Sequence, residues 1–242
     1  RQIFRNVDFS LEKGEILSIL GPNGAGKSTL LNCIANLLEP TGGEIYLDGC
    51  SLSSLKSNEI AQKIGYVPQI HVPTYGYSVR EFAVMGRTPY LGIFSKPSKV
   101  DYDLADEALQ KLDISHLRDK PYTEISGGER QQATIARVLV QEPDIIMLDE
   151  PTAHLDYGNQ LRMVKLIKKL SKQGYSIIMT THQPDHVIML ESYVGILGYD
   201  GIMKIGRAEE IIQGELLTKL YDTNIKLVYI DEVKRRVCLP LM

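Results

Sequence analysis

The chain has 242 residues, of which 43% are hydrophobic and 24% are charged, so it is long and apolar enough for a sizeable buried core in one large or two small domains. Its formal net charge of −3 provides no dominant basic field, and we therefore expect no nucleic-acid partner. The three cysteines are widely spaced, which favours a reducing compartment over a disulfide or zinc framework. No apolar stretch is long enough to span a bilayer and the N-terminus has no signal-peptide pattern, so we expect a soluble chain.

The first part of the chain predicts strands alternating with short helices. Residues 3–11 alternate apolar and polar side chains, which predicts a strand with one face in solvent. The apolar run at 15–20 is typical of a buried parallel strand, and a helix is expected after the glycine-rich loop that follows it. The helix is expected at 30–38, with further strands at 44–49 and 64–67 and a short helix at 58–63.

The middle of the chain differs, because strand signals give way to helical periodicity between about residues 78 and 141. Strands and helices then alternate again, which predicts βαβ units and a mostly parallel sheet. We predict one α/β domain, with a core over 1–77 and 142–242 and a helical subdomain over about 78–141. The helices are expected at 79–86, 100–112, 127–140, 159–172 and 185–190, the strands at 144–149, 176–181 and 225–230, and helical turns at 208–213 and 216–221.

The strand at 15–20 runs into a loop with the pattern of a phosphate-binding loop. Its glycines allow several backbone N–H groups to point into one bowl, and the following helix adds the positive end of its dipole. Lys27 can then reach the β- and γ-phosphate oxygens, and the Ser28 hydroxyl can ligate Mg²⁺. The flanking strand and helix argue against a turn that binds nothing. The loop consists of Gly21, Pro22, Asn23, Gly24, Ala25, Gly26, Lys27, Ser28 and Thr29.

A second constellation lies at the end of the apolar strand at 144–149, where Asp149 and Glu150 follow each other. In phosphate-loop proteins the carboxyl end of a neighbouring strand lies beside the loop. Asp149 can then hold Mg²⁺ through its water shell, and Glu150 can orient or deprotonate an attacking water. An Asp-Glu pair alone could equally be a turn or a helix cap, so the interpretation depends on the phosphate loop.

A third feature, Ser126-Gly127-Gly128-Glu129, opens the helix predicted at 127–140. A Ser N-cap with two glycines is a second helix start that can accept an anion, although a merely well-capped helix would have the same pattern. One nucleotide does not need two such termini from one chain. The pattern therefore suggests a site completed by a second chain.

Taken together, these motifs resemble, in order and spacing, those of the ATPase subunit of ABC transporters. The resemblance covers nearly the whole chain and implies a phosphate-loop NTPase core with an antiparallel β subdomain and an inserted helical subdomain. The matching positions are Gly21 to Thr29, Gln69, Ile125 to Gln132, Leu148 to Thr152, Ala153 to Asp156, and Thr180 to His182.

The resemblance implies a homodimer of head-to-tail subunits that encloses two ATP molecules with Mg²⁺. Each ATP would lie between the phosphate loop of one chain and Ser126, Gly127, Gly128 and Glu129 of the other. The remaining implied roles are Glu150 as catalytic base, His182 as γ-phosphate contact, Gln69 as contact to Mg²⁺ or the attacking water, Ser28 and Asp149 as Mg²⁺ ligands, and Asp156 in communication across the dimer.

Two positions depart from the family pattern. Glu129 stands where the signature usually has Gln, a variant also common among uptake ATPases, so no loss of function is implied. The aromatic residue that usually stacks on adenine has no candidate before the strand at 15–20, and Phe4 lies too far along the chain. We expect it in residues preceding Arg1.

The helical region between Gln69 and Ser126 resembles ATPases of importers for metal chelates, namely ferric siderophores, haem and cobalamin, and in some members molybdate. This implies membrane permease subunits, indirect work with a periplasmic or lipoprotein substrate-binding protein, and a peripheral place on the cytoplasmic face of the inner membrane. Aromatic residues in this region either pack within it or line a groove for a permease helix. They are Tyr75, Tyr77, Phe82, Tyr90 and Phe94.

Other members of the superfamily remain as alternatives. An ABC exporter with a separate ATPase subunit would have the same catalytic motifs. A DNA-maintenance ATPase would need a long coiled coil between phosphate loop and signature, and no heptads are sustained there. A ribosome-associated ATPase usually has two cassettes in one chain, and this sequence has one.

Overall fold

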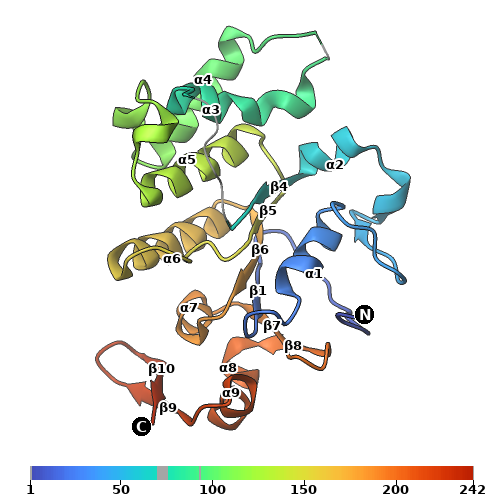
Figure 1. Ribbon diagram of the computed structural model, residues 1–242, viewed down its shortest axis with the longest axis vertical. Helices are drawn as coiled ribbons and strands as arrows, with labels where there is room; N and C mark the ends of the chain where they lie inside the picture. Colours follow the sequence, from blue (N-terminus) through green and yellow to red (C-terminus); the bar gives the residue numbers. More distant parts are fainter. Residues whose placement is uncertain (1, 70–75, 93, 242) are drawn as a thin grey trace.

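The computed structural model describes residues 2–69, 76–92 and 94–241. Its centre is a six-stranded sheet in which β8 alone runs antiparallel to its neighbour (Figure 1). The sheet therefore confirms the predicted α/β class with mostly parallel strands. From one edge to the other it contains β4 (Ile64–Val67), β5 (Ile145–Leu148), β6 (Ser176–Thr181), β1 (Ile16–Leu20), β7 (Tyr193–Leu197) and β8 (Met203–Arg207).

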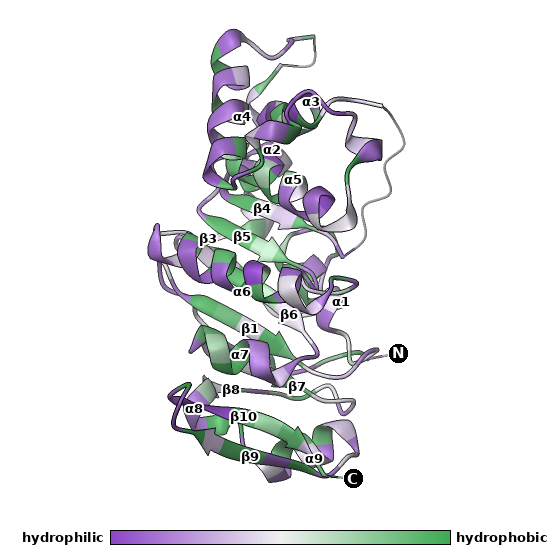
Figure 2. Ribbon diagram, turned by 90° about the vertical axis from the view of Figure 1, so that its left-hand side faces the viewer, coloured by the Kyte–Doolittle hydropathy of each residue, from purple (hydrophilic) through white to green (hydrophobic). Residues whose placement is uncertain are grey.

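Helices cover both faces of this sheet (Figure 1). On one side lies α1 (Lys27–Ile34), with α2 (Ser57–Lys63) beyond it, and on the other lie α6 (Tyr157–Lys172) and α7 (Pro184–Leu190). Successive strand residues therefore enter different apolar clusters. Met147 and Ile178 pack on the α1 side, whereas Ile146 and Ile177 pack on the α6 side. This double burial explains why β1 and β5 are almost wholly apolar, as their green ribbons in Figure 2 show.

A group of helices lies beyond β4, at the top of Figure 1, and its elements pack on one another. Its three α-helices each begin after a serine whose side chain accepts from the third helical residue, while that residue's carboxylate accepts from the serine N–H. The elements are α3 (Val79–Val84), α4 (Lys99–Lys111), α5 (Gly127–Val140) and the 3₁₀ segments Met85–Tyr90, Ser115–Leu117 and Tyr122–Glu124.

The C-terminal part forms a separate layer below β8 (Figures 1 and 2). It shares a small apolar cluster with the sheet, in which Leu217 joins Leu20, Val187 and Val194. The elements of this layer are α8 (Ala208–Ile211), α9 (Gly214–Tyr221) and the antiparallel hairpin of β9 (Ile225–Ile230) and β10 (Arg235–Pro240).

A second small antiparallel pair lies near α2, at the other side of the molecule. It consists of β2 (Tyr46–Leu47) and β3 (Cys50–Ser51), and the 3₁₀ segment Leu52–Ser54 follows it.

Three predicted elements differ in the structure. The strand predicted at 3–11 is wrong, since the segment makes one isolated bridge, Arg5 to Ile202, and its apolar residues instead pack against the α1-side cluster. The helix predicted to reach residue 38 ends at Ile34, because Asn36 takes a left-handed conformation with φ +56°. The strand predicted at 44–49 shortens to the two residues of β2.

Candidate functional site

The phosphate loop joins β1 to α1 and takes conformations that its glycines permit. Gly24 has φ +80° and Gly26, the N-cap of α1, has φ +100°, both in the left-handed region that other residues avoid. Lys27 begins α1 and its ammonium turns back into the loop. Its Nζ donates to the carbonyl oxygens of Gly21 and Pro22 at 2.9 Å and 3.1 Å. The loop carbonyls thus hold the Lys27 ammonium beside the bowl that the sequence pattern predicts for a phosphate.

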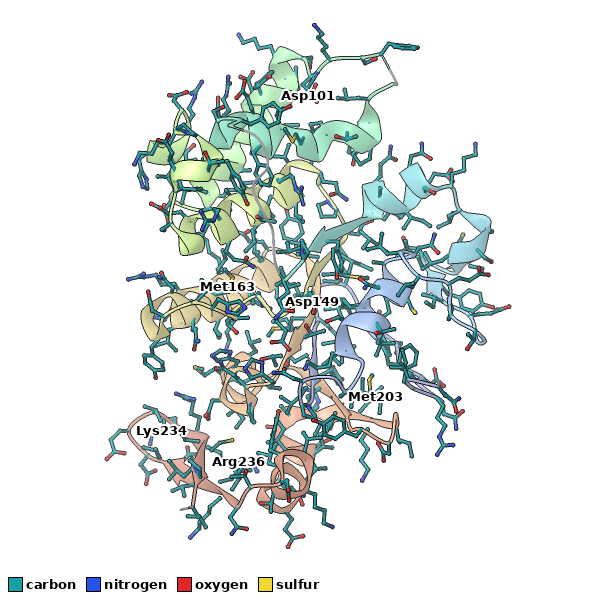
Figure 3. All side chains as sticks on the ribbon, viewed as in Figure 1. Asp101, Asp149, Met163, Met203, Lys234 and Arg236 are labelled. Carbon is teal, nitrogen blue, oxygen red and sulfur yellow. The ribbon has the colours of Figure 1, made fainter. Side chains whose placement is uncertain are left out.

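Asp149, near the middle of the molecule in Figure 3, is the centre of a network of hydroxyl groups. The Ser28 Oγ donates to its Oδ1 at 3.0 Å, and the Thr180 Oγ1 donates to the same oxygen at 2.6 Å. The Tyr66 hydroxyl lies 2.9 Å from the Asn32 Oδ1 and 3.4 Å from the Asp149 Oδ2. A serine hydroxyl beside a carboxylate at a phosphate loop provides the hard oxygen donors that Mg²⁺ takes, so these residues fit the ion.

Glu150 is held by two cationic or potentially cationic groups. Its Oε1 lies 3.0 Å from the Lys27 Nζ, and its Oε2 lies 2.7 Å from the His182 Nδ1. The pKa of Glu150 is lowered to about 2, against the opposing effect of burial. The hydrogen bond with His182 is the largest cause, and the hydrogen bond and charge of Lys27 follow. The carboxylate is therefore ionised near neutral pH.

The backbone of Glu150 is also constrained. Its φ of +46° lies in the left-handed region, where a non-glycine residue costs roughly 1 kcal/mol or more. The Glu150 N–H donates to the Thr180 Oγ1 at 2.8 Å, so one threonine hydroxyl binds the backbone of Glu150 and the side chain of Asp149. Strain of this kind persists only where neighbours hold it, and here Thr180 does so.

The phosphate loop opens into a cavity of about 500 Å³. Gln69 and Glu150 line it together with residues 23–29, so the structure brings together the predicted residues of the loop and of two distant segments. Gln2, Ile3 and Tyr199 line it as well, and the Tyr199 hydroxyl donates to the Asn23 carbonyl at 3.2 Å. No sequence signal pointed to Tyr199, which follows a strand far along the chain.

The signature residues and Asp156 lie together at a different place. Ser126 caps α5, with its Oγ accepting from the Glu129 N–H at 3.3 Å, and Asp156 caps α6, with its Oδ1 accepting from the Asn159 N–H at 2.8 Å. Ser126, Gly128, Glu129 and Asn159 line a second cavity of about 570 Å³. Within the described part of the chain, this cavity and the phosphate-loop cavity share no lining residue.

The sequence did not predict a role at the site for four residues. Thr180 was seen only as a neighbour of His182, and Tyr66 only as part of a strand, yet both bind Asp149. The signal that could have found them is position, because a hydroxyl residue near the carboxyl end of a neighbouring parallel strand lies beside the residue after β5. Asn32, one turn along α1 from Ser28, and Tyr199 had no comparable signal.

The aromatic residues of the helical region divide between the two interpretations. Phe82 stacks on Tyr122 with ring centroids 4.1 Å apart, and the Tyr90 hydroxyl donates to the Gln141 carbonyl at 3.0 Å, so these two pack within the region. Phe94 is 98% exposed and Tyr77 is 45% exposed. Tyr75 lies outside the described residues.

None of the described helices has the length and apolar character needed to cross a membrane. Among the same residues, no cluster of three or more histidine, cysteine, aspartate or glutamate side chains is arranged to hold a metal ion. An Mg²⁺ site at Ser28 and Asp149 would therefore need further oxygen ligands from water or nucleotide.

Comparisons with known proteins agree with the motifs. The family model described as ABC transporter matches residues 4–153. The molybdate import ATP-binding protein MolC of Haemophilus influenzae is 37% identical over 220 residues, which cover 90% of this chain and 81% of that protein. The ferric enterobactin transport ATP-binding protein FepC of Escherichia coli is 33% identical over 231 residues, which cover 95% of this chain and 84% of that protein. A solved inward-facing structure of a metal-chelate type ABC transporter has a TM-score of 0.88 and 34% identity, covering 100% of this chain and 93% of that one.

Proposed function

The chain belongs to the ABC transporter family, and on that premise we propose that it is the ATP-hydrolysing subunit of an importer for a metal chelate or an oxyanion. The observation that carries the proposal is the likeness over the full chain to a metal-chelate type transporter. The names of the relatives, which refer to molybdate import and ferric enterobactin transport, support the same range of cargoes. Iron siderophores, haem, cobalamin and molybdate are therefore the candidates.

We assign ATP to the phosphate-loop cavity, which residues 23–29 line and where the Lys27 ammonium would bind the phosphates. Ser28 and Asp149 would hold Mg²⁺, with Gln69 contacting the ion or the attacking water. The Ser28 and Asp149 oxygens already lie 3.0 Å apart, which supports this assignment. The bound ion supplies charge neutralisation for the phosphates.

Glu150 is assigned as the base that accepts a proton from the attacking water, with His182 contacting the γ-phosphate. The Glu150 carboxylate lies against Lys27 and His182, the two groups that we assign to the phosphates. Phosphates bound at these groups would compete with Glu150 for them. Losing these partners raises the pKa of Glu150 from about 2, and a more basic carboxylate is a better proton acceptor.

We propose that two copies of the chain form a homodimer with composite sites. The separation of the signature cavity from the phosphate-loop cavity supports this arrangement, because Ser126 to Glu129 cannot complete their own chain's site without another molecule. Asp156 caps α6 beside the signature helix, so it lies where it can link one site to the other. ATP then drives transport only through its preference for the closed dimer.

The same proposal includes partners and location. Permease subunits would bind beside Gln69, where exposed Tyr77 and Phe94 belong to the neighbouring helical region. A substrate-binding protein would act through the permease, and the subunit would lie peripherally on the cytoplasmic face of the inner membrane. We retain the division into a core over 1–77 and 142–242 and a helical subdomain over about 78–141, supported by the mutual packing of α3, α4 and α5.

The proposal is tested by isolating the tagged chain from native membranes in mild detergent and identifying what copurifies by mass. A stoichiometric many-helix permease, encoded beside a binding protein for a chelate or an oxyanion, is the expected result. Recovery with soluble proteins, nucleic acid or ribosomes alone would overturn the transport assignment. Radiolabelled cargo uptake by vesicles that contain the complex then identifies the transported class.

A further inference from the structure

The C-terminal layer reaches back to the residue that the proposed function places at the γ-phosphate. Tyr221, the last residue of α9, donates its hydroxyl hydrogen to the His182 carbonyl oxygen at 2.9 Å. The two residues are 39 positions apart in sequence. Tyr221 is half-buried against the apolar cluster that joins this layer to the sheet. The contact is therefore a built connection between the two layers.

A second contact holds the same turn from its other end. The Asp185 Oδ1 accepts from the Cys238 N–H of β10 at 3.0 Å, and Asp185 is the second residue of α7. α7 packs on both β1 and β10, and Figure 2 shows it between β1 and the hairpin. The turn from His182 to Asp185 thus has one hydrogen bond from α9 and one from β10.

The contact matters because it acts on the backbone that carries the His182 side chain. The His182 carbonyl belongs to the peptide that leads into Gln183, whose N–H donates to the Thr181 Oγ1 at 3.1 Å. The Tyr221 hydroxyl therefore fixes one side of this peptide while Thr181 fixes the other. Hydrogen bonds on both sides restrain this peptide, which adjoins the Cα of His182, and so they restrain the backbone from which the His182 Nδ1 reaches to 2.7 Å from the Glu150 Oε2.

We propose that Tyr221 is a positioning residue for ATP hydrolysis, because its hydroxyl holds the backbone from which the His182 imidazole reaches Glu150. The inference rests on the role proposed for His182. Tyr221 does not touch the cavity that would hold nucleotide. Its effect is therefore indirect, through His182, and we expect it mainly in the chemical step, because Lys27 and the phosphate loop remain in place to bind ATP.

The Tyr221 hydroxyl is suited to this task over the whole physiological range. The pKa of Tyr221 is raised, mainly by burial and then by the charges of Cys238 and Glu150. The group therefore stays protonated and remains a donor to the His182 carbonyl. A phenylalanine at this position keeps the ring and its packing and removes only the donor.

The first experiment compares ATP hydrolysis by the purified full chain with that of Tyr221→Phe. We expect kcat to fall roughly fivefold, the value of one ordinary hydrogen bond, with KM for ATP unchanged within about twofold. Tyr229→Phe on β9 is the matched control, since Tyr229 lies on the same hairpin layer and is 55% exposed. It is expected to match the wild type in both constants.

The second experiment separates positioning from a general loss of stability. In a His182→Ala background the peptide no longer directs an imidazole, so Tyr221→Phe should cause no further loss in single-turnover hydrolysis. An equal fivefold loss in both backgrounds, or a wild-type kcat for Tyr221→Phe, would overturn the inference. If His182→Ala itself hydrolyses normally, the proposed role of His182 fails instead, so the two failures are distinguishable.

Discussion

Replacing Glu150 by Gln tests the competition between this carboxylate and ATP for Lys27. The substitution keeps the size of the side chain and removes the charge that lies 3.0 Å from the Lys27 Nζ. The fall of the Glu150 pKa from 4.5 to about 2 corresponds to roughly 3 kcal/mol of net favourable interaction, shared between His182 and Lys27. In the wild type, ATP must overcome this interaction before its phosphates reach Lys27.

We therefore expect Glu150→Gln to bind ATP more tightly while losing turnover. The roughly 3 kcal/mol sets the upper limit, so the Kd should fall by at most about 100-fold, and by less to the extent that His182, the largest cause of the shift, supplies the interaction. Hydrolysis should fall at least 100-fold, the usual contribution of a positioned general base. The variant should also accumulate as an ATP-bound dimer.

Calorimetric titration with ATP, steady-state hydrolysis and light scattering measure the three quantities. Glu191→Gln is the matched control, because its Oε2 lies 2.9 Å from the Lys168 Nζ in an exposed pair far from the phosphate loop. It is expected to leave the Kd and the rate unchanged. An ATP Kd for Glu150→Gln equal to that of the wild type would refute the competition, and normal hydrolysis would refute the role of the base.

Two further predictions follow from the same network. Because the folded pKa of Glu150 is depressed, its contribution to stability is present above about pH 4.5 and is lost as pH falls toward 2. The free energy of unfolding in urea should therefore vary less with pH for Glu150→Gln than for the wild type over this window. Parallel curves of this free energy against pH would contradict the reasoning. Thr180→Val leaves the buried Glu150 N–H without its acceptor and should cost about 1–3 kcal/mol of unfolding free energy. Exposed Thr88→Val is its control, and equal losses in the two would count against the network.

The local features of the fold were predictable where one short stretch of sequence decides them. The helix that starts after Ser126 has its cap, its glycines and its periodic apolar face within 15 residues, and α5 begins and ends at the predicted positions. The strand β6 was equally clear, since it is buried at every position and contains the apolar run Ile177-Ile178-Met179. The phosphate loop was predictable for the same reason, because its glycines and Lys27 all lie within one short stretch of sequence.

The contacts that organise the site depend instead on the alignment of distant strands. β5 and β6 pair with Leu148 opposite Met179, so the next residues, Asp149 and Thr180, come together at the carboxyl edge. A shift of one residue would turn one of these side chains to the other face of the sheet. No local pattern specifies that register. For the same reason the apolar alternation at 3–11 predicted a strand where the structure has only an apolar edge packed on α1.

Glu129 offers a test of the second half of the proposed composite site. Hydrogen bonding to the Ser126 side chain, and then to the Ser126 N–H, which lies 2.7 Å from its Oε2, lowers the pKa of Glu129 and keeps it charged at the start of α5. In the proposed composite site, a fixed negative charge there would repel the phosphates of a partner's ATP. Glu129→Gln can keep the reciprocal cap and remove this repulsion, since an amide oxygen accepts the same N–H.

The change should therefore strengthen ATP-dependent dimerisation without weakening the helix. A unit charge near the helix start opposes a second anion by roughly 1 kcal/mol, so the ATP concentration for half-dimerisation should fall about fivefold when measured by light scattering in the Glu150→Gln background. Glu81→Gln is the control, because Glu81 makes the same cap with Ser78 at the start of α3, away from the signature. If both variants shift dimerisation equally, the effect comes from net charge. If only Glu129→Gln shifts it, the start of α5 faces the nucleotide of the partner.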